Sequence, residues 1–217
     1  MCSFFTRKEN DSFLALTNYM EETLVIEKEI SAKALDLLLD VENYKTPYAK
    51  SVADPYDLIL DIAKKVSLQT GFVSGMLSLP SGYFGYATIL PEIFFLLKMQ
   101  ARMVKDIAAL YGKEKLITKE ILLYCIFKRN QISLLERTIK ISSTRALVRP
   151  MTVNLFLKFL EKYIVGIKFS KKLTRFLPLL GFLSSGIISF VDTKVVALTA
   201  SNLFSKEILL TEENEIS

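Results

Sequence analysis

Four charged residues lie close to the two most hydrophobic parts of the sequence and could do chemistry there. Glu92 and Asp192 each stand beside an uncharged stretch, and Arg102 and Lys194 could pair with them if those stretches pack together. A carboxylate buried in such a place needs a partner, or its pKa rises. The same charges are also expected at the water-facing ends of apolar helices, and we favour that interpretation.

The rest of the sequence lacks the usual residues of catalytic sites. It contains no histidine, which removes the commonest general base, zinc ligand and partner of a nucleophilic serine or cysteine. It has no phosphate-binding Gly-x-x-x-x-Gly-Lys-Ser/Thr loop and no Gly-x-Ser-x-Gly motif. Two cysteines, Cys2 and Cys125, are too few for a disulfide framework, and we expect Cys125 to pack as a small apolar side chain. We therefore predict a protein that is not an enzyme and has no cofactor or metal.

A stretch of 23 residues without charge, from Gln69 to Pro91, organises the chain. Its length suits a membrane span, a hairpin at a membrane surface or a helix pair in a soluble core. Glycine and proline inside the stretch disfavour one straight helix. We expect two short helices broken near Leu79-Pro80-Ser81-Gly82. Each would be about ten residues or about 15 Å long, half the thickness of a bilayer core.

Start and stop signals predict helices on both sides of this stretch. Asp54-Pro55 begins one helix, Gly112 ends another in a left-handed cap, and Thr118 caps a third. The first of these helices is expected to bury Leu58, Ile59, Ile62, Ala63 and Val66. Further helices are expected over residues 11–41, 132–141 and 153–167. Because no strong alternating strand pattern occurs, the predicted fold class is all-α, a helical bundle with two hydrophobic helical hairpins broken by proline and glycine.

The order of motifs between residues 69 and 112 points to a family. A Gly-rich hydrophobic turn with Leu-Pro comes first, then a polar residue near a second proline, then Gln-x-Arg-x-x-x-x-Ile-Ala-x-x-Tyr-Gly. This order resembles the EcsC family of bacterial proteins. Residues 176–204 look like the family's closing element, a hydrophobic hairpin opened by a proline and spaced glycines. The residues that carry the resemblance are Gly71, Gly75, Pro80, Pro91, Gln100, Arg102, Ile107, Ala108, Tyr111, Gly112, Pro178, Gly181 and Gly186. Two positions depart from the pattern, Glu92 where Asp is expected and Asp192 where Asn is commoner.

The resemblance covers residues 69–204 and implies what kind of protein this is. The family is named after an accessory protein encoded with an ABC transporter, and it has no established reaction. The implied organisation is an EcsC-like helical domain over residues 54–207. A helical arm and loop precede it (1–53), and an acidic tail follows it (208–217).

Basic residues cluster between the two hydrophobic segments. From Lys128 to Arg175, twelve Lys or Arg stand against two Glu, a net charge of +10, so the remaining residues sum to −5 in a chain of +5. Cations beside an inserted apolar segment each gain on the order of 1 kcal/mol near an anionic leaflet. We interpret Lys168, Lys171, Lys172 and Arg175 as membrane-surface contacts, while the same cations could also coat a soluble bundle.

Two classes of function remain open. In the first, the chain is a non-enzymatic accessory protein on the cytoplasmic side of the membrane, where it binds the anionic lipid surface, a membrane protein such as a transporter, or itself. In the second, it is a soluble cytoplasmic domain that binds a protein partner. Specific nucleic-acid binding is not expected, because no helix-turn-helix, zinc knuckle or aromatic stacking platform accompanies the basic residues. The distinguishing feature is whether the chain's own helices cover the surface from Phe72 to Leu90.

Overall fold

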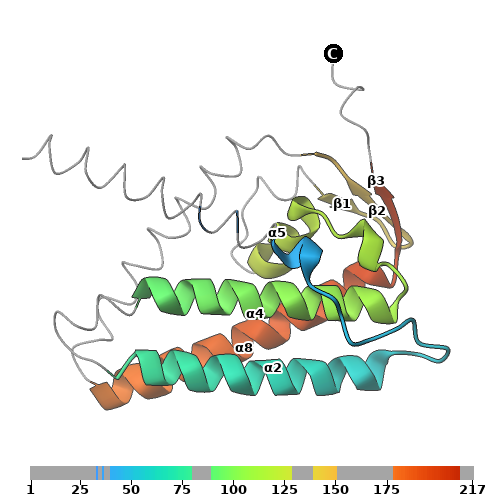
Figure 1. Cartoon of the computed structure of the whole chain (residues 1–217). Coiled ribbons are helices and arrows are strands. Elements are labelled where there is room, and N and C mark those ends of the chain that lie inside the picture. The colour runs from blue at the N-terminus through green and yellow to red at the C-terminus, as the bar shows by residue number, and fades with distance from the viewer. Residues whose placement is uncertain are drawn as a thin grey trace, which may run out of the picture.

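The structure is a computed structural model that describes residues 33, 36, 40–79, 89–128, 139–150 and 178–210. Within these ranges, four helices pack together beside a small three-stranded sheet (Figure 1). In chain order the elements are the short 3₁₀-helix η1 (Val41–Asn43), α2 (Tyr56–Leu77), α4 (Ile89–Leu110), the 3₁₀-helix η2 (Glu114–Leu116), α5 (Lys119–Phe127), β1 (Ile139–Ile141), β2 (Arg145–Val148), α8 (Pro178–Phe204) and β3 (Glu207–Leu210).

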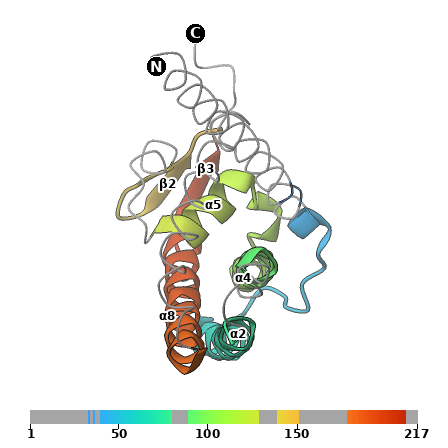
Figure 2. The ribbon, with the colours of Figure 1, turned by 90° about the vertical axis from the view of Figure 1, so that its left-hand side faces the viewer.

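Three long helices, α2, α4 and α8, lie side by side and form the lower part of the molecule in Figure 1. The end of α2 lies beside the beginnings of α4 and α8, whereas the sheet and α5 lie toward the other end (Figures 1 and 2). α2 therefore runs antiparallel to both of its neighbours. The end of α2 and the starts of α4 and α8, which belong to the two uncharged segments, consequently meet at one end of this three-helix layer.

The predicted start of α2 is confirmed to within two residues. The Asp54 side chain accepts a hydrogen bond from the Tyr56 backbone amide over 3.1 Å, and the first intrahelical bond runs from Ile59 to the Pro55 carbonyl. Four of the five residues predicted to be buried, Ile59, Ile62, Ala63 and Val66, are buried. Leu58 is not, since 46% of its surface is exposed.

The predicted glycine cap of α4 is also confirmed. Gly112 has a φ of +70°, a left-handed conformation that disfavours residues with a Cβ. Its amide donates to the Ala109 carbonyl over 2.8 Å, and the Lys113 amide donates to the Ala108 carbonyl over 2.8 Å. These two bonds form a Schellman motif, which satisfies carbonyls that the end of the helix would otherwise leave without partners.

The helix α5 lies inside the apolar core. The Thr118 hydroxyl accepts from the Ile121 amide over 3.4 Å, so the predicted N-cap is confirmed. Every side chain from Glu120 to Phe127 is buried, including the expected core residue Cys125. The same core takes Ile107 and Ala108 from α4 and a row of small and apolar residues from the end of α8, Val196, Ala197, Ala200, Leu203 and Phe204. The C-terminal half of α8 is thus built into the protein interior.

The expectation of a fold without strands is wrong, because a three-stranded sheet accompanies the helices. β1 and β2 pair antiparallel, with Lys140 opposite Leu147, and β2 pairs parallel with β3, with Ala146 opposite Ile208. A helix had been expected to continue to residue 141, but residues 139–141 form β1. β3 also takes up residues 208–210 of the segment assigned to an acidic tail.

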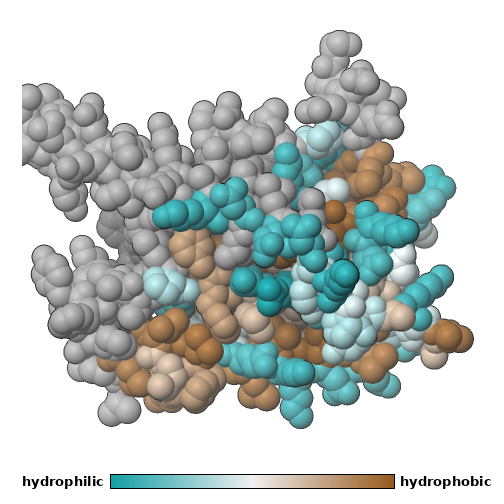
Figure 3. Space-filling model, viewed as in Figure 1, coloured by the Kyte–Doolittle hydropathy of each residue, from teal (hydrophilic) through white to brown (hydrophobic). Residues whose placement is uncertain are grey.

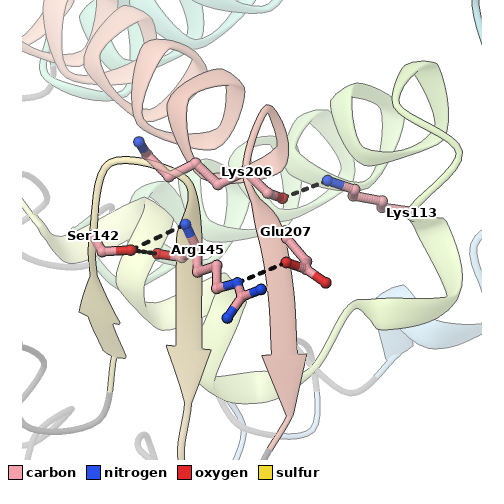
Figure 4. A network of polar contacts seen from close by, with 5 residues as sticks. All are labelled: Lys113, Ser142, Arg145, Lys206 and Glu207. Carbon is pink, nitrogen blue, oxygen red and sulfur yellow. Dashed lines mark hydrogen bonds and ion pairs between the residues drawn. The ribbon is translucent and has the colours of Figure 1, made fainter.

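Lys113 connects the end of α4 to the point where α8 leads into β3. Its ammonium donates to the Phe204 carbonyl over 2.6 Å, where α8 ends. It also donates to the Lys206 carbonyl (Figure 4). A cation at this position is also attracted to the negative, C-terminal end of the helix dipole. On the outer side, the Arg145 guanidinium pairs with the Glu207 carboxylate over 2.9 Å between β2 and β3 (Figure 4). That pair is largely exposed and adds little to the free energy of unfolding.

The break predicted near residues 79–82 agrees with the end of α2 at Leu77 and the start of α4 at Ile89. α2 is longer than expected, because it continues through Gly71 and Gly75 as one 22-residue helix. The second segment differs from the prediction more. From Pro178 to Phe204 it is one continuous helix, with no break at Gly181 or Gly186, so the described part of this segment is not a hairpin.

Several predicted features lie outside the described residues. These are most of the helix expected over 11–41, residues 132–138, the helix expected over 153–167, Pro80, and the four cations Lys168, Lys171, Lys172 and Arg175.

Candidate functional site

Hydroxyl groups and one carboxylate fill the interface between α2, α4 and α8. The Glu92 carboxylate on α4 is fully buried and accepts a hydrogen bond from the Ser74 hydroxyl on α2. The Ser189 hydroxyl on α8 donates to the Ser74 oxygen over 2.8 Å. One buried carboxylate thus connects all three helices through two serines, in a region where the flanking sequence carries no charge. The expectation that Glu92 faces water is therefore wrong.

A second polar group lies further along the same interface. Thr70 on α2 and Thr193 on α8 share a hydrogen bond of 2.9 Å. The Gln100 amide on α4 donates to Thr193 over 3.3 Å and to the Asp192 carboxylate over 3.4 Å. Asp192 therefore lies at a different level of the interface from Glu92. Together the two groups form what we call the polar seam, which contains Thr70, Ser74, Glu92, Gln100, Ser189, Asp192 and Thr193.

Sequence reasoning missed the polar seam, although the sequence carries a signal for it. Small hydroxyl residues recur at spacings of three and four in both uncharged segments, at Ser67, Thr70, Ser74 and Ser78 and at Ser185, Ser189 and Thr193. Such spacing places them on one face of a helix. All seven are buried, so these faces meet each other.

Glycines bring α2 and α8 into close contact beside the polar seam. A Cβ added to Gly71 would lie 3.0 Å from the Gly186 carbonyl oxygen, and a Cβ on Gly186 would lie 3.0 Å from the Gly71 carbonyl oxygen. A Cβ on Gly75 would lie 2.9 Å from the Phe182 ring. Three of the residues that carry the family resemblance therefore share one interface and one role, which is to let two backbones approach.

The outer surfaces of α2 and α8 are apolar where their inner surfaces are polar. Phe72 is 63% exposed and Ile187 is 61% exposed. We call this surface the apolar face, and its members are Leu68, Phe72, Met76, Leu79, Leu183, Ile187, Ile188 and Val191. Figure 3 shows brown side chains gathered at the end of the molecule where α2 ends and α4 begins, with teal side chains beyond them.

A shallow groove joins the two halves of the apolar face. Its volume is about 270 Å³, and Gly71 and Gly186 lie among its lining residues. Phe72 of α2 and Ile187 and Phe190 of α8 are among the apolar side chains that line it. The apolar face is therefore one continuous surface across two helices. The described helices leave Phe72, Met76 and Leu79 exposed, and residues 80–88 lie outside the described ranges.

The two cations named as possible partners of the carboxylates lie over aromatic rings. The Arg102 guanidinium lies over the Tyr44 ring, 5.1 Å from its centroid, and the Lys194 ammonium lies over the Phe190 ring at 4.6 Å. The structure thus brings Glu92 and Asp192 into one interface, but at different levels and on different hydrogen-bond partners. Of the remaining residues in the family pattern, Tyr111 shares a hydrogen bond of 3.1 Å with Ser201 on α8, while Pro91, Pro178 and Gly181 lie in the first turns of α4 and α8.

Outside the polar seam, burial shifts the pKa of several titratable groups. Burial raises the pKa of the Cys125 thiol, which makes the reactive thiolate scarce at neutral pH. Burial lowers the pKa of Lys113, the residue that holds the end of α8. Burial also raises the pKa of Asp106, whose Oδ1 atom has no hydrogen-bond partner. Among the described residues, no three carboxylate or thiol side chains lie close enough to hold a metal ion.

One helix in the described part of the chain is long and apolar enough to cross a membrane, over Phe182–Phe204 of α8. About a third of its most apolar window is buried by the protein. The buried residues follow one face of the helix, from Ser185 and Ser189 to the core residues Val196, Ala200 and Phe204. The N-terminal half carries the exposed residues of the apolar face.

Comparisons of the chain with protein-family models, with curated proteins and with solved structures found no match.

Proposed function

We propose that this chain is a non-enzymatic accessory protein of EcsC type that attaches to the cytoplasmic side of a membrane through its apolar face. The single observation that carries the proposal is the reversed polarity of the second half of α2 and the first half of α8. In water-soluble bundles, apolar side chains face inward and polar ones face outward. Here serines, threonines and a carboxylate face inward, and Phe72, Met76, Leu183 and Ile187 face outward.

This arrangement is typical of helices that pack inside lipid. There, apolar side chains gain nothing by leaving the lipid for a helix interface, so helices associate through small residues and hydrogen bonds between side chains. Here small residues meet at the Gly71–Gly186 contact, and the Thr70–Thr193 pair forms a hydrogen bond between side chains of two helices. Exposed apolar residues at this density on a soluble monomer would also mark an interaction site.

Membership of the EcsC family is part of this proposal. The structural positions of the residues that carry the resemblance support it. The glycines, the Tyr-Gly helix end and the Gln that carry the resemblance all have distinct structural roles in one helical unit. In this proposal, the first hydrophobic hairpin comprises the end of α2 and the start of α4, on either side of residues 78–88. A second hairpin would require residues before Pro178, which lie outside the described ranges.

Vesicle flotation with purified protein tests membrane attachment. We expect the parent protein to bind vesicles of neutral and of anionic phospholipid. Replacing Phe72 and Ile187 by Ser should weaken binding to both by about 2–4 kcal/mol, because two side chains no longer bury apolar surface in lipid. Since both residues are exposed, the variant should unfold at the same denaturant concentration as the parent.

A matched control uses Leu58→Ser with Leu60→Ser, two exposed apolar residues near the other end of α2. This pair should leave vesicle binding unchanged. A parent protein that binds neither kind of vesicle, while it remains stable and monomeric without detergent, would overturn the proposal. The second class of function, a soluble domain that binds a protein through the same apolar face, would then be favoured.

A further inference from the structure

We infer that a collar of lysines around the three-helix layer, formed by Lys64, Lys65, Lys98 and Lys194, binds the phosphates of anionic phospholipids and limits insertion to one leaflet. This inference rests on the proposed membrane attachment and adds the partner's chemistry and the depth. None of the four lysines belongs to the basic section between Lys128 and Arg175.

The hydrogen bonds of the polar seam show which residues share a level along the helices. Thr70, Thr193 and Gln100 contact one another, so they mark one cross-section through α2, α8 and α4. Lys194 directly follows Thr193, and Lys98 precedes Gln100 by two residues. Lys65 precedes Thr70 by five residues, which places it about 8 Å further from the apolar end at a rise of about 1.5 Å per residue.

On α2 and α8, exposed charge is absent from the described residues on the other side of this cross-section. α2 has no charged residue after Lys65, and α8 has none before Asp192. On α4, Glu92 is buried, and Lys98 is the first charged residue that reaches the surface. Counted from the apolar end, the first cations on α2, α4 and α8 are all lysines. Asp192, the carboxylate at the same level, accepts a hydrogen bond from the Gln100 amide.

The distance from the collar to the end of the helices matches one leaflet. From Thr70 to Leu79, nine residues of helix or turn span about 14 Å, and from Gln100 back to Ile89, eleven residues span about 16 Å. The hydrocarbon core of one leaflet is about 15 Å thick. With the apolar face in that core, the collar lies at the level of the phosphates, where each lysine is attracted to an anionic surface.

Lysine side chains are suited to this position. Their methylene groups cover apolar surface while the ammonium reaches toward water or headgroups. Lys194 shows this geometry, because its ammonium lies over the Phe190 ring, one turn from Gly186 in the groove of the apolar face. Lys64, Lys65 and Lys194 are exposed, and Lys98 is half-buried.

Vesicle binding of a collar variant tests the inference. Replacing Lys64, Lys65, Lys98 and Lys194 by Gln should weaken binding to vesicles with a third of anionic phospholipid by up to about 600-fold, at about fivefold per lysine. Binding to vesicles of neutral phospholipid alone should stay within about threefold of the parent, because the apolar face is unchanged. Loss of neutral binding in the parent would contradict the proposed attachment, whereas equal binding of parent and collar variant to anionic vesicles would contradict the collar.

The chain provides a control of equal charge. Lys45, Lys50, Lys115 and Lys140 are exposed on the loop before α2, on η2 and on the sheet, away from the apolar face. Their replacement by Gln changes the net charge by the same amount. We expect this control to lower binding to anionic vesicles by less than about fivefold, since charges more than a Debye length of about 8 Å from the surface are screened. A control effect as large as that of the collar variant would show a dependence on net charge alone and would overturn the inference.

Depth is measured separately with a fluorescent probe attached at Leu68→Cys or Met76→Cys and quenched by spin-labelled lipids. The eight residues between these positions correspond to about 12 Å along α2. The probe at position 76 should be quenched best by labels deep in the acyl chains, and the probe at 68 by labels near the headgroup. Equal depth for both probes, or quenching of neither because a second copy of the chain covers them, would contradict the inference.

Discussion

At the scale of single residues, Asp106 is a carboxylate whose charge the fold opposes. Its side chain is 8% exposed, and its Oδ1 atom has no hydrogen-bond partner. Hydrogen bonding by Thr46 and by Tyr44, whose hydroxyl lies 3.5 Å from Oδ2, partly offsets the cost of burial, and the cations Arg102 and Lys105 add to this. Burial is the larger effect, so the pKa of Asp106 lies above its ordinary value.

This raised pKa predicts how stability depends on pH. Because the folded protein holds the Asp106 proton more tightly than the unfolded chain does, this residue contributes stability below the ordinary Asp pKa of about 3.9. That contribution is lost as the pH rises through the pKa of the folded state. Relative to Asp106→Asn, the parent should therefore lose free energy of unfolding as the pH rises from about 4 toward neutrality.

Denaturant unfolding of the parent and of Asp106→Asn at several pH values measures the effect. Asp54→Asn serves as the control for the removal of one carboxylate, because Asp54 is exposed at the start of α2. A parent that loses free energy of unfolding relative to Asp106→Asn as the pH falls below 4, or a difference between the two that does not change with pH, would contradict the assignment.

At the scale of secondary-structure elements, the contact between α2 and α8 depends on the absence of side chains at one point. Gly71 and Gly186 face each other, and each would place a Cβ 3.0 Å from the other's carbonyl oxygen. Carbonyl oxygens of the helix backbone cannot move away as the end of a flexible side chain can. The hydrogen bond between Thr70 and Thr193 lies close to this contact and depends on the same helix separation.

Replacing Gly186 by Val should therefore separate the helices and weaken the polar seam. We expect a loss of about 1–3 kcal/mol in the free energy of unfolding, the usual cost of excess volume in a close-packed interface. Denaturant unfolding followed by circular dichroism measures this free energy, with parent and variant in the same detergent. Ile187→Val is the neighbouring control, and it should change the free energy by less than about 0.5 kcal/mol because Ile187 is exposed. A Gly186→Val variant as stable as the parent would show that the helices are further apart than in this structure.

The elements also show which local signals could be interpreted from the sequence. Helix ends were predicted well where a single residue determines them, as Thr118 and Gly112 do. Strands β1 and β2 have three and four residues, too few for alternation to separate them from a short helical segment. Their partner β3 follows β2 by about sixty residues, and pairing across that distance leaves no local pattern.

At the scale of the whole molecule, the sequence predicted the presence of the apolar segments but not which way their side chains face. The flanking helix was interpreted from its buried apolar residues, and that succeeded for Ile59 and Ile62. In the uncharged segments the same approach would place Phe72 inside, whereas Ser74 and Gly71 are inside and Phe72 is outside. Composition alone could not show this reversal, because it depends on which surfaces of α2 and α8 meet.

The whole molecule also constrains how α8 can lie relative to a membrane. α8 is 27 residues long, or about 40 Å, which is enough to cross a bilayer. Its second half, however, is packed into the core with α5, and Lys113 holds its end beside the sheet. A spanning α8 would have to remove that half from the core, so we expect only the first half to enter lipid.

Labelling of single cysteines in sealed bacterial cells and in inverted membrane vesicles tests this arrangement, in a chain whose Cys2 is changed to Ser and whose buried Cys125 is retained. A cysteine in place of the exposed Ser205, just past the end of α8, should react with a membrane-impermeant reagent in inverted vesicles and not in intact cells. A cysteine in place of Leu183 should react in neither, because the apolar face is inside one leaflet. Both positions should react in inverted vesicles after detergent is added, which confirms that each is chemically accessible. Reaction at position 183 in intact cells, with position 205 protected there, would show that α8 crosses the membrane and that insertion is not limited to one leaflet.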